Sequence, residues 1–247
     1  MARRIGLIQT RGIGDIIIAL PIAQEFLDRG DEVHWPIDRR FFSAFQAAEP
    51  AVHFIPVDPP ADDSEAAEQP YLYDMPLRLL KDLRCDTIFT LYSFRRGFAV
   101  ASEALAASLK FDEYKYAIAG VPFSRKWTLR LTRNLERERA LHDSLNVRQP
   151  YVCVHSEGSN IHATIQPNPQ WLAGRAVVSI RPLTDNPFDW LSTLEGADHL
   201  LLLDSCFSNL VEQLNLPNPK SLVLRSPMRF TPVMKNGWTF IAPQKRR

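Results

Sequence analysis

The residue of this sequence best suited to chemistry is Asp15, which directly follows the glycine-bearing segment 10–14. A carboxylate next to glycines can accept a proton from a bound hydroxyl group, because glycine lets a ligand approach the backbone closely. Asp is also among the best residues for capping the amino end of a helix, so a structural role is the alternative. The two roles are compatible, since a capping carboxylate is fixed in direction and can still face a ligand.

The elements around Asp15 would place it at the edge of a sheet. Residues 5–8 form an apolar run typical of a buried strand, and apolar residues recur at helical spacings from Ile16 to Leu27. The order strand, glycine loop, helix is typical of an open α/β sheet, which binds ligands beyond the carboxyl ends of its strands. Glycines stand only at positions 12 and 14 and no P-loop lysine follows, so the pattern disfavours a dinucleotide or ATP site.

The composition allows one large domain or two smaller ones. The chain has 247 residues, 45% of them hydrophobic, and a formal net charge of +1. This charge disfavours wholesale binding to nucleic acid. Cys85, Cys153 and Cys206 lie far apart without a CxxC pair, which indicates neither a disulfide framework nor a zinc site. Every apolar run is too short to span a membrane and the first residues lack a signal segment, so we expect a cytosolic protein.

Strand-like and helix-like segments alternate along the first 148 residues. We expect strands at 32–38, 52–57, 86–91 and 114–119, and helices at 41–48, 77–83 and 98–109. This alternation predicts a parallel, doubly wound sheet with helices on its faces. A Pro-bounded acidic loop at residues 59–70 separates the third strand from the helix that follows it.

Residues 123–145 carry a cluster of basic side chains. Read as one helix, the segment places four of them on one face: Lys126, Arg130, Arg133 and Arg137. One interpretation is a solvated helix face that Glu136 and Glu138 partly neutralise. The other is a basic surface for an anionic partner, such as a lipid headgroup region or a phosphorylated acceptor. Residues 146–150 have the composition of a linker.

A second α/β unit is predicted after this linker. We expect its strands at 151–155, 176–180, 199–203 and 222–224. The clearest signal is the apolar run 199–203, which leads into Asp204 and Ser205 and then into a helix that Pro217 ends. Two such units imply a cleft between facing strand ends, with Asp15 on one side and residues 156–159 on the other.

With these features in place, the chain resembles glycosyltransferase family 9, the heptosyltransferase-like branch with the two-lobed GT-B fold. The matching segments are Gly14-Asp15 before an apolar helix carrying Pro21, residues 33–41, 85–88, 119–122 and 151–159, and Asp204-Ser205 at the start of a helix. The resemblance implies two Rossmann-like lobes whose parallel sheets face a cleft. Residues 1–148 would form the acceptor-side lobe with a helical linker, and residues 149–247 a shortened lobe for the nucleotide-sugar.

The resemblance further implies an inverting transfer of a sugar from a nucleotide-sugar donor to a hydroxyl group of a glycoconjugate acceptor. The family's proposed catalytic base corresponds to Asp15, and its acceptor-side loop to Thr10, Arg11, Gly12 and Gly14. The residues that would hold the donor follow the strands of the second lobe: Ser156, Gly158, Ser159, Arg181, Asp204, Ser205 and Asn209. We expect a cytoplasmic enzyme, peripheral at the inner membrane face where its acceptor is membrane-associated or anionic, and no nucleic-acid partner.

Neither a metal nor a cofactor is expected. The sequence contains no Asp-x-Asp pair that would hold a metal on the diphosphate. Backbone amides at helix amino ends, near Gly158 and Ser205, can bind a diphosphate without one.

The second lobe also departs from the family pattern. Cys206 and Asn209 replace the glycine and histidine of Asp-Ser-Gly-x-x-His, and the lysine expected after residue 159 is absent. His162 is either a substitute phosphate contact or a plain surface histidine. These departures keep open a catalytically inactive GT-B-like protein that binds a glycan or a nucleotide. A transferase that acts on modified nucleic acid through the basic residues 125–139 is a third hypothesis, which the near-zero net charge disfavours.

Overall fold

The chain forms two compact units. The computed structural model describes residues 2–61, 68–94, 100–158, 161–162, 165 and 169–242. Contacts between Cα atoms divide the chain into Met1–Thr132 and Arg133–Arg247. Within the described residues, none of the helices combines the length and the apolar character that a membrane span requires.

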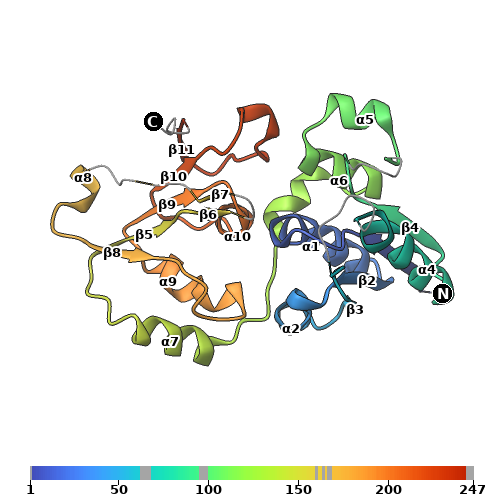
Figure 1. Ribbon diagram of the computed structural model, residues 1–247, viewed down its shortest axis with the longest axis horizontal. Coiled ribbons are helices and arrows are strands. Elements are labelled where there is room, and N and C mark those ends of the chain that lie inside the picture. The colour runs from blue at the N-terminus through green and yellow to red at the C-terminus, as the bar shows by residue number, and fades with distance from the viewer. Residues whose placement is uncertain are drawn as a thin grey trace. The chain divides into compact units, whose positions relative to one another are not determined.

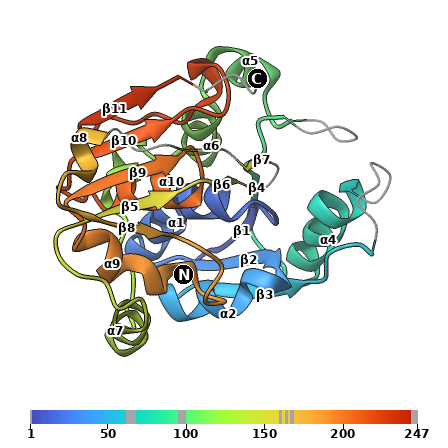
Figure 2. The ribbon, with the colours of Figure 1, turned by 60° about the vertical axis from the view of Figure 1, so that its left-hand side comes forward.

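The first unit is built on a four-stranded parallel sheet with the strand order β3-β2-β1-β4; Figure 1 labels β2, β3 and β4, and Figure 2 also labels β1. Its strands are β1 (Arg4–Ile8), β2 (Glu32–Asp38), β3 (His53–Val57) and β4 (Thr87–Thr90). Strand β1 pairs in parallel with both β2 and β4, and all of its residues after Arg4 are buried. A short apolar run buried on both faces is typical of the centre of a parallel sheet that helices cover.

The helical elements of this unit confirm most of the expected alternation. They are α1 (Ile13–Asp28), α2 (Arg39–Ala48), the π-helical turn η1 (Pro70–Asp74), α4 (Met75–Asp82), α5 (Glu103–Ser108), α6 (Phe111–Ala119) and the 3-10 turn η2 (Phe123–Thr128). The expected helix 98–109 is shorter in the structure, where Ser102 caps α5 by accepting a hydrogen bond from the Leu105 amide. Its residues 98 and 99 lie outside the described ranges.

The strand predicted at residues 114–119 is wrong, because these residues lie in α6. Two acidic residues in the first turn, Asp112 and Glu113, stabilise the helix by interacting with the positive end of its dipole. Gly120 ends the helix in the left-handed conformation, with φ of 63°. The segment Tyr114-Lys115-Tyr116 alternates aromatic and charged residues, which is typical of a half-exposed strand. In the structure all three side chains are buried, so the alternation does not mark an exposed face.

The prediction that the basic residues of 123–145 share one helix face is also wrong. Helix α7 (Leu135–Ser144) begins only after η2 and a stretch without helical structure. Lys126 is fully buried and pairs with Asp112 at 2.7 Å. Four of the arginines pair with carboxylates of their own unit: Arg125 with Glu25 and Asp28, Arg130 with Asp28, Arg133 with Glu138 and Glu195, and Arg137 with Asp185 and Asp189.

The second unit contains a five-stranded parallel sheet with the strand order β11-β10-β9-β5-β8. Figure 2 shows these strands in this order from top to bottom. The strands are β5 (Tyr151–His155), β8 (Ala176–Ser179), β9 (His199–Leu203), β10 (Lys220–Val223) and β11 (Trp238–Ile241). A small antiparallel pair, β6 (Glu157–Gly158) and β7 (Ile161–His162), follows β5. Strand β11 was not expected from the sequence.

Short helices accompany this second sheet. They are α7, α8 (Pro169–Leu172), the 3-10 turn η3 (Pro187–Trp190), α9 (Leu191–Glu195), α10 (Cys206–Gln213) and the 3-10 turn η4 (Met228–Phe230). Helix α7 packs against η3 and α9. The division by contacts therefore falls before α7, whereas the sequence suggested a boundary at residue 148.

Candidate functional site

The glycine loop places Asp15 in the first turn of α1 with its carboxylate accessible. The N-cap of α1 is Gly12, whose φ of 88° is a left-handed conformation that suits glycine, and Gly14 lies one residue before Asp15 inside the helix. The capping interpretation of Asp15 is therefore wrong, since Gly12 occupies that position. The Asp15 side chain is 32% exposed.

Lys115 of α6 is the main residue of this site that the sequence analysis missed. Its Nζ lies 3.0 Å from Oδ1 of Asp15, and it donates to Oε1 of Gln9 at 2.7 Å and to the Leu91 carbonyl at 3.2 Å. The Lys115 side chain is only 2% exposed. A buried ammonium that is matched by three acceptors fixes one oxygen of the Asp15 carboxylate.

The other oxygen of Asp15 lies beside the glycine loop. A Cβ atom added at Gly12 would stand only 2.8 Å from Oδ2 of Asp15. The missing side chain at Gly12 thus leaves the room that this oxygen occupies. The carboxylate is held through Oδ1 and presents Oδ2 to the loop.

Buried polar groups hold the backbone of the loop itself. The amides of Thr10 and Arg11 donate to the hydroxyl of Tyr92 at 2.9 and 3.2 Å, and Gln9 Nε2 donates to the Arg11 carbonyl at 2.8 Å. Thr10 is fully buried, and its hydroxyl donates to the Leu72 carbonyl. Arg11 is partly exposed and has an ion-pair contact with Glu68 at 3.9 Å. The predicted loop residues therefore include both buried supports and an exposed cation.

A second carboxylate, Asp38, lies at the end of the neighbouring strand β2. It is fully buried, caps α2 by accepting from the Arg40 amide, and receives the Tyr71 hydroxyl at 2.6 Å. Burial alone would raise the pKa of Asp38, but hydrogen bonds from Arg40 and Tyr71 outweigh it and lower that pKa. Asp38 thus stays charged, and its partners give it a structural role in holding α2 and Tyr71.

In the second unit, the predicted donor-side residues gather at the carboxyl edge of the sheet. Ser156 and Gly158 follow β5, Arg181 follows β8, and Asp204 and Ser205 follow β9. Asp204 and Ser205 are buried, whereas Arg181 is exposed. Ser159 lies outside the described residues, and so does the side chain of His162.

His155 is a further residue of this edge that the sequence analysis did not single out. Its Nδ1 lies 3.0 Å from Oγ of Ser205, and its ring packs edge-on against Phe207. Burial lowers the pKa of His155 to about 4. The imidazole is therefore neutral at pH 7, and the pair is a neutral hydrogen bond at the amino end of α10.

Asn209 and Arg225 also belong to this edge. Asn209 is buried inside α10, where its Nδ2 donates to the Ser205 carbonyl at 3.0 Å. Arg225 follows β10, is exposed, and its guanidinium lies next to Gly158, where an added Cβ would stand 3.1 Å from Nη1. Arg225 and Arg181 are thus exposed cations beyond the strand ends, a feature typical of surfaces that bind phosphate groups.

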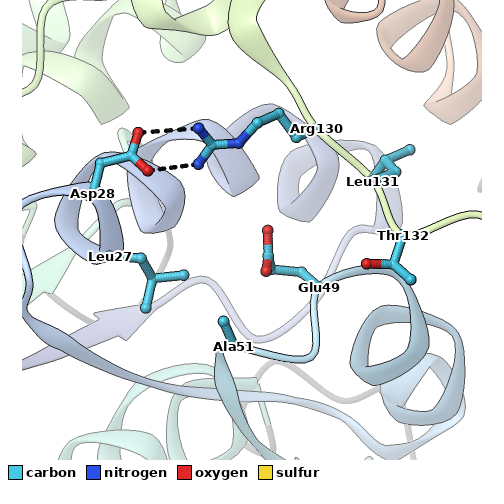
Figure 3. A pocket seen from close by; sticks show the side chains of 7 residues that line it. All are labelled: Leu27, Asp28, Glu49, Ala51, Arg130, Leu131 and Thr132. Carbon is cyan, nitrogen blue, oxygen red and sulfur yellow. Dashed lines mark hydrogen bonds and ion pairs between the residues drawn. The ribbon is translucent and has the colours of Figure 1, made fainter.

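A pocket of about 380 Å³ lies elsewhere on the first unit (Figure 3). Its lining residues are Leu27, Asp28, Glu49, Ala51, Arg130, Leu131 and Thr132. Asp28 and Arg130 form a two-pronged ion pair across one wall, which Figure 3 shows. Asp28 ends α1 and lies about 20 Å along the helix from Asp15 at 1.5 Å per residue, so this pocket is not the Asp15 site.

Within the described ranges, no three or more His, Cys, Asp and Glu side chains gather in a group that could hold a metal ion. The thiol of Cys206, beside the His155–Ser205 pair, is kept protonated because burial raises its pKa to about 11. The first edge therefore offers a partly exposed carboxylate, and the second offers a neutral hydrogen-bonded pair, a buried Asp204 and exposed arginines.

The two parallel sheets with their covering helices have the GT-B glycosyltransferase fold, which confirms the expected fold class. The sequence itself matches no family model, and no curated protein matches it. The solved structure of the glycosyl transferase family 9 from Veillonella parvula DSM 2008 is similar with a TM-score of 0.65 at 12% identity. The match covers 97% of this chain and 86% of that chain.

Two Escherichia coli structures are similar in the same way. The ADP-heptose lps heptosyltransferase II has a TM-score of 0.58 at 12% identity, with 97% of this chain and 90% of that chain covered. The heptosyltransferase WaaC with ADP has a TM-score of 0.56 at 11% identity, with 97% and 93% covered. At such identities the likeness establishes the fold, and the resemblance to family 9 that the sequence suggested is confirmed at that level.

Proposed function

We propose that this protein is an inverting glycosyltransferase that moves a sugar from a nucleotide-sugar donor to a hydroxyl group of a glycoconjugate acceptor. The observation that carries the proposal is the Asp15 carboxylate, which is held at Oδ1 by Lys115, has a side chain that is 32% exposed, and lies with Oδ2 beside a glycine loop. This carboxylate lies just beyond the end of β1, in a chain with the GT-B fold. Open α/β sheets bind their ligands at such strand ends.

The chemistry assigned to Asp15 is general base catalysis. Oδ2 takes the proton of the acceptor hydroxyl while that oxygen forms a bond to the anomeric carbon of the donor sugar. The bond from this carbon to the leaving diphosphate breaks, and the nucleoside diphosphate departs with the electron pair. Attack from the face opposite the leaving group inverts the anomeric configuration. A positioned base of this kind contributes roughly 10²- to 10⁴-fold to the rate.

The second unit supplies groups suited to the diphosphate. Arg181 and Arg225 are exposed beyond the strand ends, and the amino end of α10 lies at the same edge, where backbone amides can bind an anion. The neutral His155–Ser205 pair adds hydrogen-bonding capacity without a negative charge that would repel phosphate. These features support Ser156, Gly158, Ser205 and their neighbours as the donor-side residues.

An adenine nucleotide is the first donor class to test. One similar structure is that of WaaC with ADP, and another is that of TibC, an iron-containing heptosyltransferase, in complex with ADP-D-beta-D-heptose. The TibC match, at 14% identity and a TM-score of 0.57, covers 97% of this chain and 62% of that chain. We propose that the present protein transfers sugar without a metal or cofactor, so turnover should persist in EDTA.

The experiment has two stages. A thermal-shift screen with ADP, UDP, GDP, CMP and dTDP identifies the nucleotide, because a ligand that binds only the native state raises the melting temperature. Nucleotide release from the matching sugar donors is then measured for the wild type, Asp15→Asn and Asp28→Asn. Asp28 is a matched control, since it is an aspartate at the other end of the same helix.

We expect Asp15→Asn to lower kcat by roughly 10²- to 10⁴-fold and Asp28→Asn to leave it nearly unchanged. Near-normal turnover of Asp15→Asn would remove Asp15 as the base. Nucleotide binding without turnover of any sugar donor would instead favour the inactive binding protein.

A further inference from the structure

Among the described residues of the first unit, Lys115 and Lys126 are two buried lysines that each pair with an aspartate, and the two pairs differ in one respect. In the first pair, both Lys126 and Asp112 are completely buried, so that pair is closed to any ligand. In the second, Lys115 is 2% exposed while Asp15 is 32% exposed. The Lys115 pair therefore has a buried cation and an anion that opens to the surface.

The environment of Lys115 defines the position of its ammonium group. The three acceptors come from three different elements: Gln9 after β1, Leu91 after β4 and Asp15 in α1. Three acceptors match the three N–H donors of a lysine. Moving the ammonium would leave at least one buried partner unsatisfied, which is costly in a protein interior.

The two oxygens of the Asp15 carboxylate have different surroundings. Lys115 fixes Oδ1, whereas Oδ2 occupies the room left by the missing side chain of Gly12, where an added Cβ would stand 2.8 Å away. Without Lys115, the Asp15 side chain could rotate about its χ angles, because no other hydrogen bond or ion pair to its carboxylate is present among the described residues. The direction of Oδ2 thus depends on a residue that does not itself face the loop.

We propose that Lys115 is a positioning residue for Asp15, which fixes Oδ1 so that Oδ2 alone receives the acceptor proton. This inference rests on the proposed function, because it assigns Lys115 a role in the same reaction. It predicts that the loss of Lys115 acts on turnover only through Asp15. The geometry of a positioned base matters strongly, since a misplacement of about 1 Å can cost roughly 10²-fold in rate.

The test is a double-mutant cycle with Lys115→Met, Asp15→Asn and the double variant, using kcat per folded molecule. We expect Lys115→Met to lower kcat by roughly 10- to 100-fold with KM changed by no more than about twofold. In the Asp15→Asn background the same change should lower kcat no further, because the group it positions is already gone. An equal loss in both backgrounds would overturn the inference and make Lys115 merely structural.

Lys126→Met is the matched control, since it also removes a buried lysine from an ion pair with an aspartate. It should destabilise the protein but leave kcat per folded molecule within about twofold of the wild type. A comparable loss of kcat in Lys126→Met would show that general loosening of the first unit explains the effect. If Asp15→Asn itself keeps normal turnover, the proposed function fails before this inference is reached.

A crystal structure provides a readout that does not require turnover. We expect the Asp15 carboxylate of Lys115→Met to have left its position beside Gly12. If Lys115→Met does not fold, Lys115→Arg keeps the charge but not the ammonium geometry, and the same displacement is expected there. An unmoved carboxylate in the variant that folds would overturn the inference.

Discussion

The carboxyl edges of the two sheets differ in how their polar and charged side chains are buried and paired. At the first edge, the buried ammonium group of Lys115 binds one oxygen of the partly exposed Asp15 carboxylate and so fixes the direction of that carboxylate. At the second edge, the buried pair of His155 and Ser205 is neutral, the carboxyl side chain of Asp204 is also buried, and the guanidinium groups of Arg181 and Arg225 are exposed. This contrast is consistent with the two tasks proposed above, because a proton acceptor needs a rigid direction, whereas a phosphate-binding surface needs positive charge and adaptable donors.

The largest expected difference between the edges is the cost of removing the buried cation. Lys115→Met should lower the free energy of unfolding of the first unit by about 3–5 kcal/mol, because it leaves buried acceptors and a carboxylate unpaired. Hydrogen exchange of β1 and β4 measures this cost, and exchange of β5 and β9 should not change. Lys81→Met, at an exposed position of α4, is the control. A loss below about 1 kcal/mol would show that the pair behaves as a surface ion pair.

The next largest effect is a loss of folding stability at acidic pH, which arises from His155 at the second edge. The pKa of His155 is about 4 in the folded protein and near 6.5 in an unfolded chain, so the unfolded state binds more protons between these values. The contribution of His155 to the free energy of unfolding is therefore fully retained above pH 6.5. It falls by roughly 3 kcal/mol in total as the pH is lowered towards 4. Hydrogen exchange of β5 and β9 at pH 7 and pH 5 tests it. His155→Gln should flatten this dependence, and an unchanged dependence would contradict the assignment.

A smaller effect is expected from a methyl group at the glycine loop. Gly12→Ala places a Cβ 2.8 Å from Asp15 Oδ2 at a backbone φ of 88°. The left-handed conformation costs about 1–2 kcal/mol for a residue with a Cβ, and the contact should also displace the carboxylate. We expect a lower melting temperature of the first unit together with a loss of kcat. Unchanged kcat would show that Oδ2 is not used.

The smallest effect on stability is expected from a glycine-to-alanine substitution at the second edge. In Gly158→Ala the new Cβ would lie 3.1 Å from Nη1 of Arg225, the far end of a flexible and exposed side chain. The guanidinium can move aside, so we expect less than about 1 kcal/mol in the unfolding free energy. Thermal unfolding compares this variant directly with Gly12→Ala. A cost equal to that of Gly12→Ala would mean that Arg225 is fixed.

Much of the fold could be predicted from local pattern. Strands β2, β5 and β9 have the bounds that the sequence suggested, because each is an apolar run between recognisable turns. The strand β1, the glycine loop and α1 were predicted for the same reason. Helix α6 was missed because its buried lysine and tyrosines imitate the alternation of a strand.

The candidate site was predictable only in part. Asp15 was found because the glycine loop and the helix that present it are adjacent in the sequence. Lys115 was not, because a lysine at a buried position makes sense only once its distant acceptors are known. Arg225 was missed for a similar reason, since its relation to Gly158 arises from the pairing order of the strands. Long-range pairing of charges leaves no local signature.

The distance along the chain between Gln9 and Lys115 also bears on how this protein is made. The two residues are 106 positions apart, so the ribosome releases the glycine loop long before the cation that completes its support. A nascent chain ending before α6 would expose uncompensated acceptors at the top of its first strand. Folding of the first unit should therefore be completed only after α6 has left the ribosome and docked on the sheet.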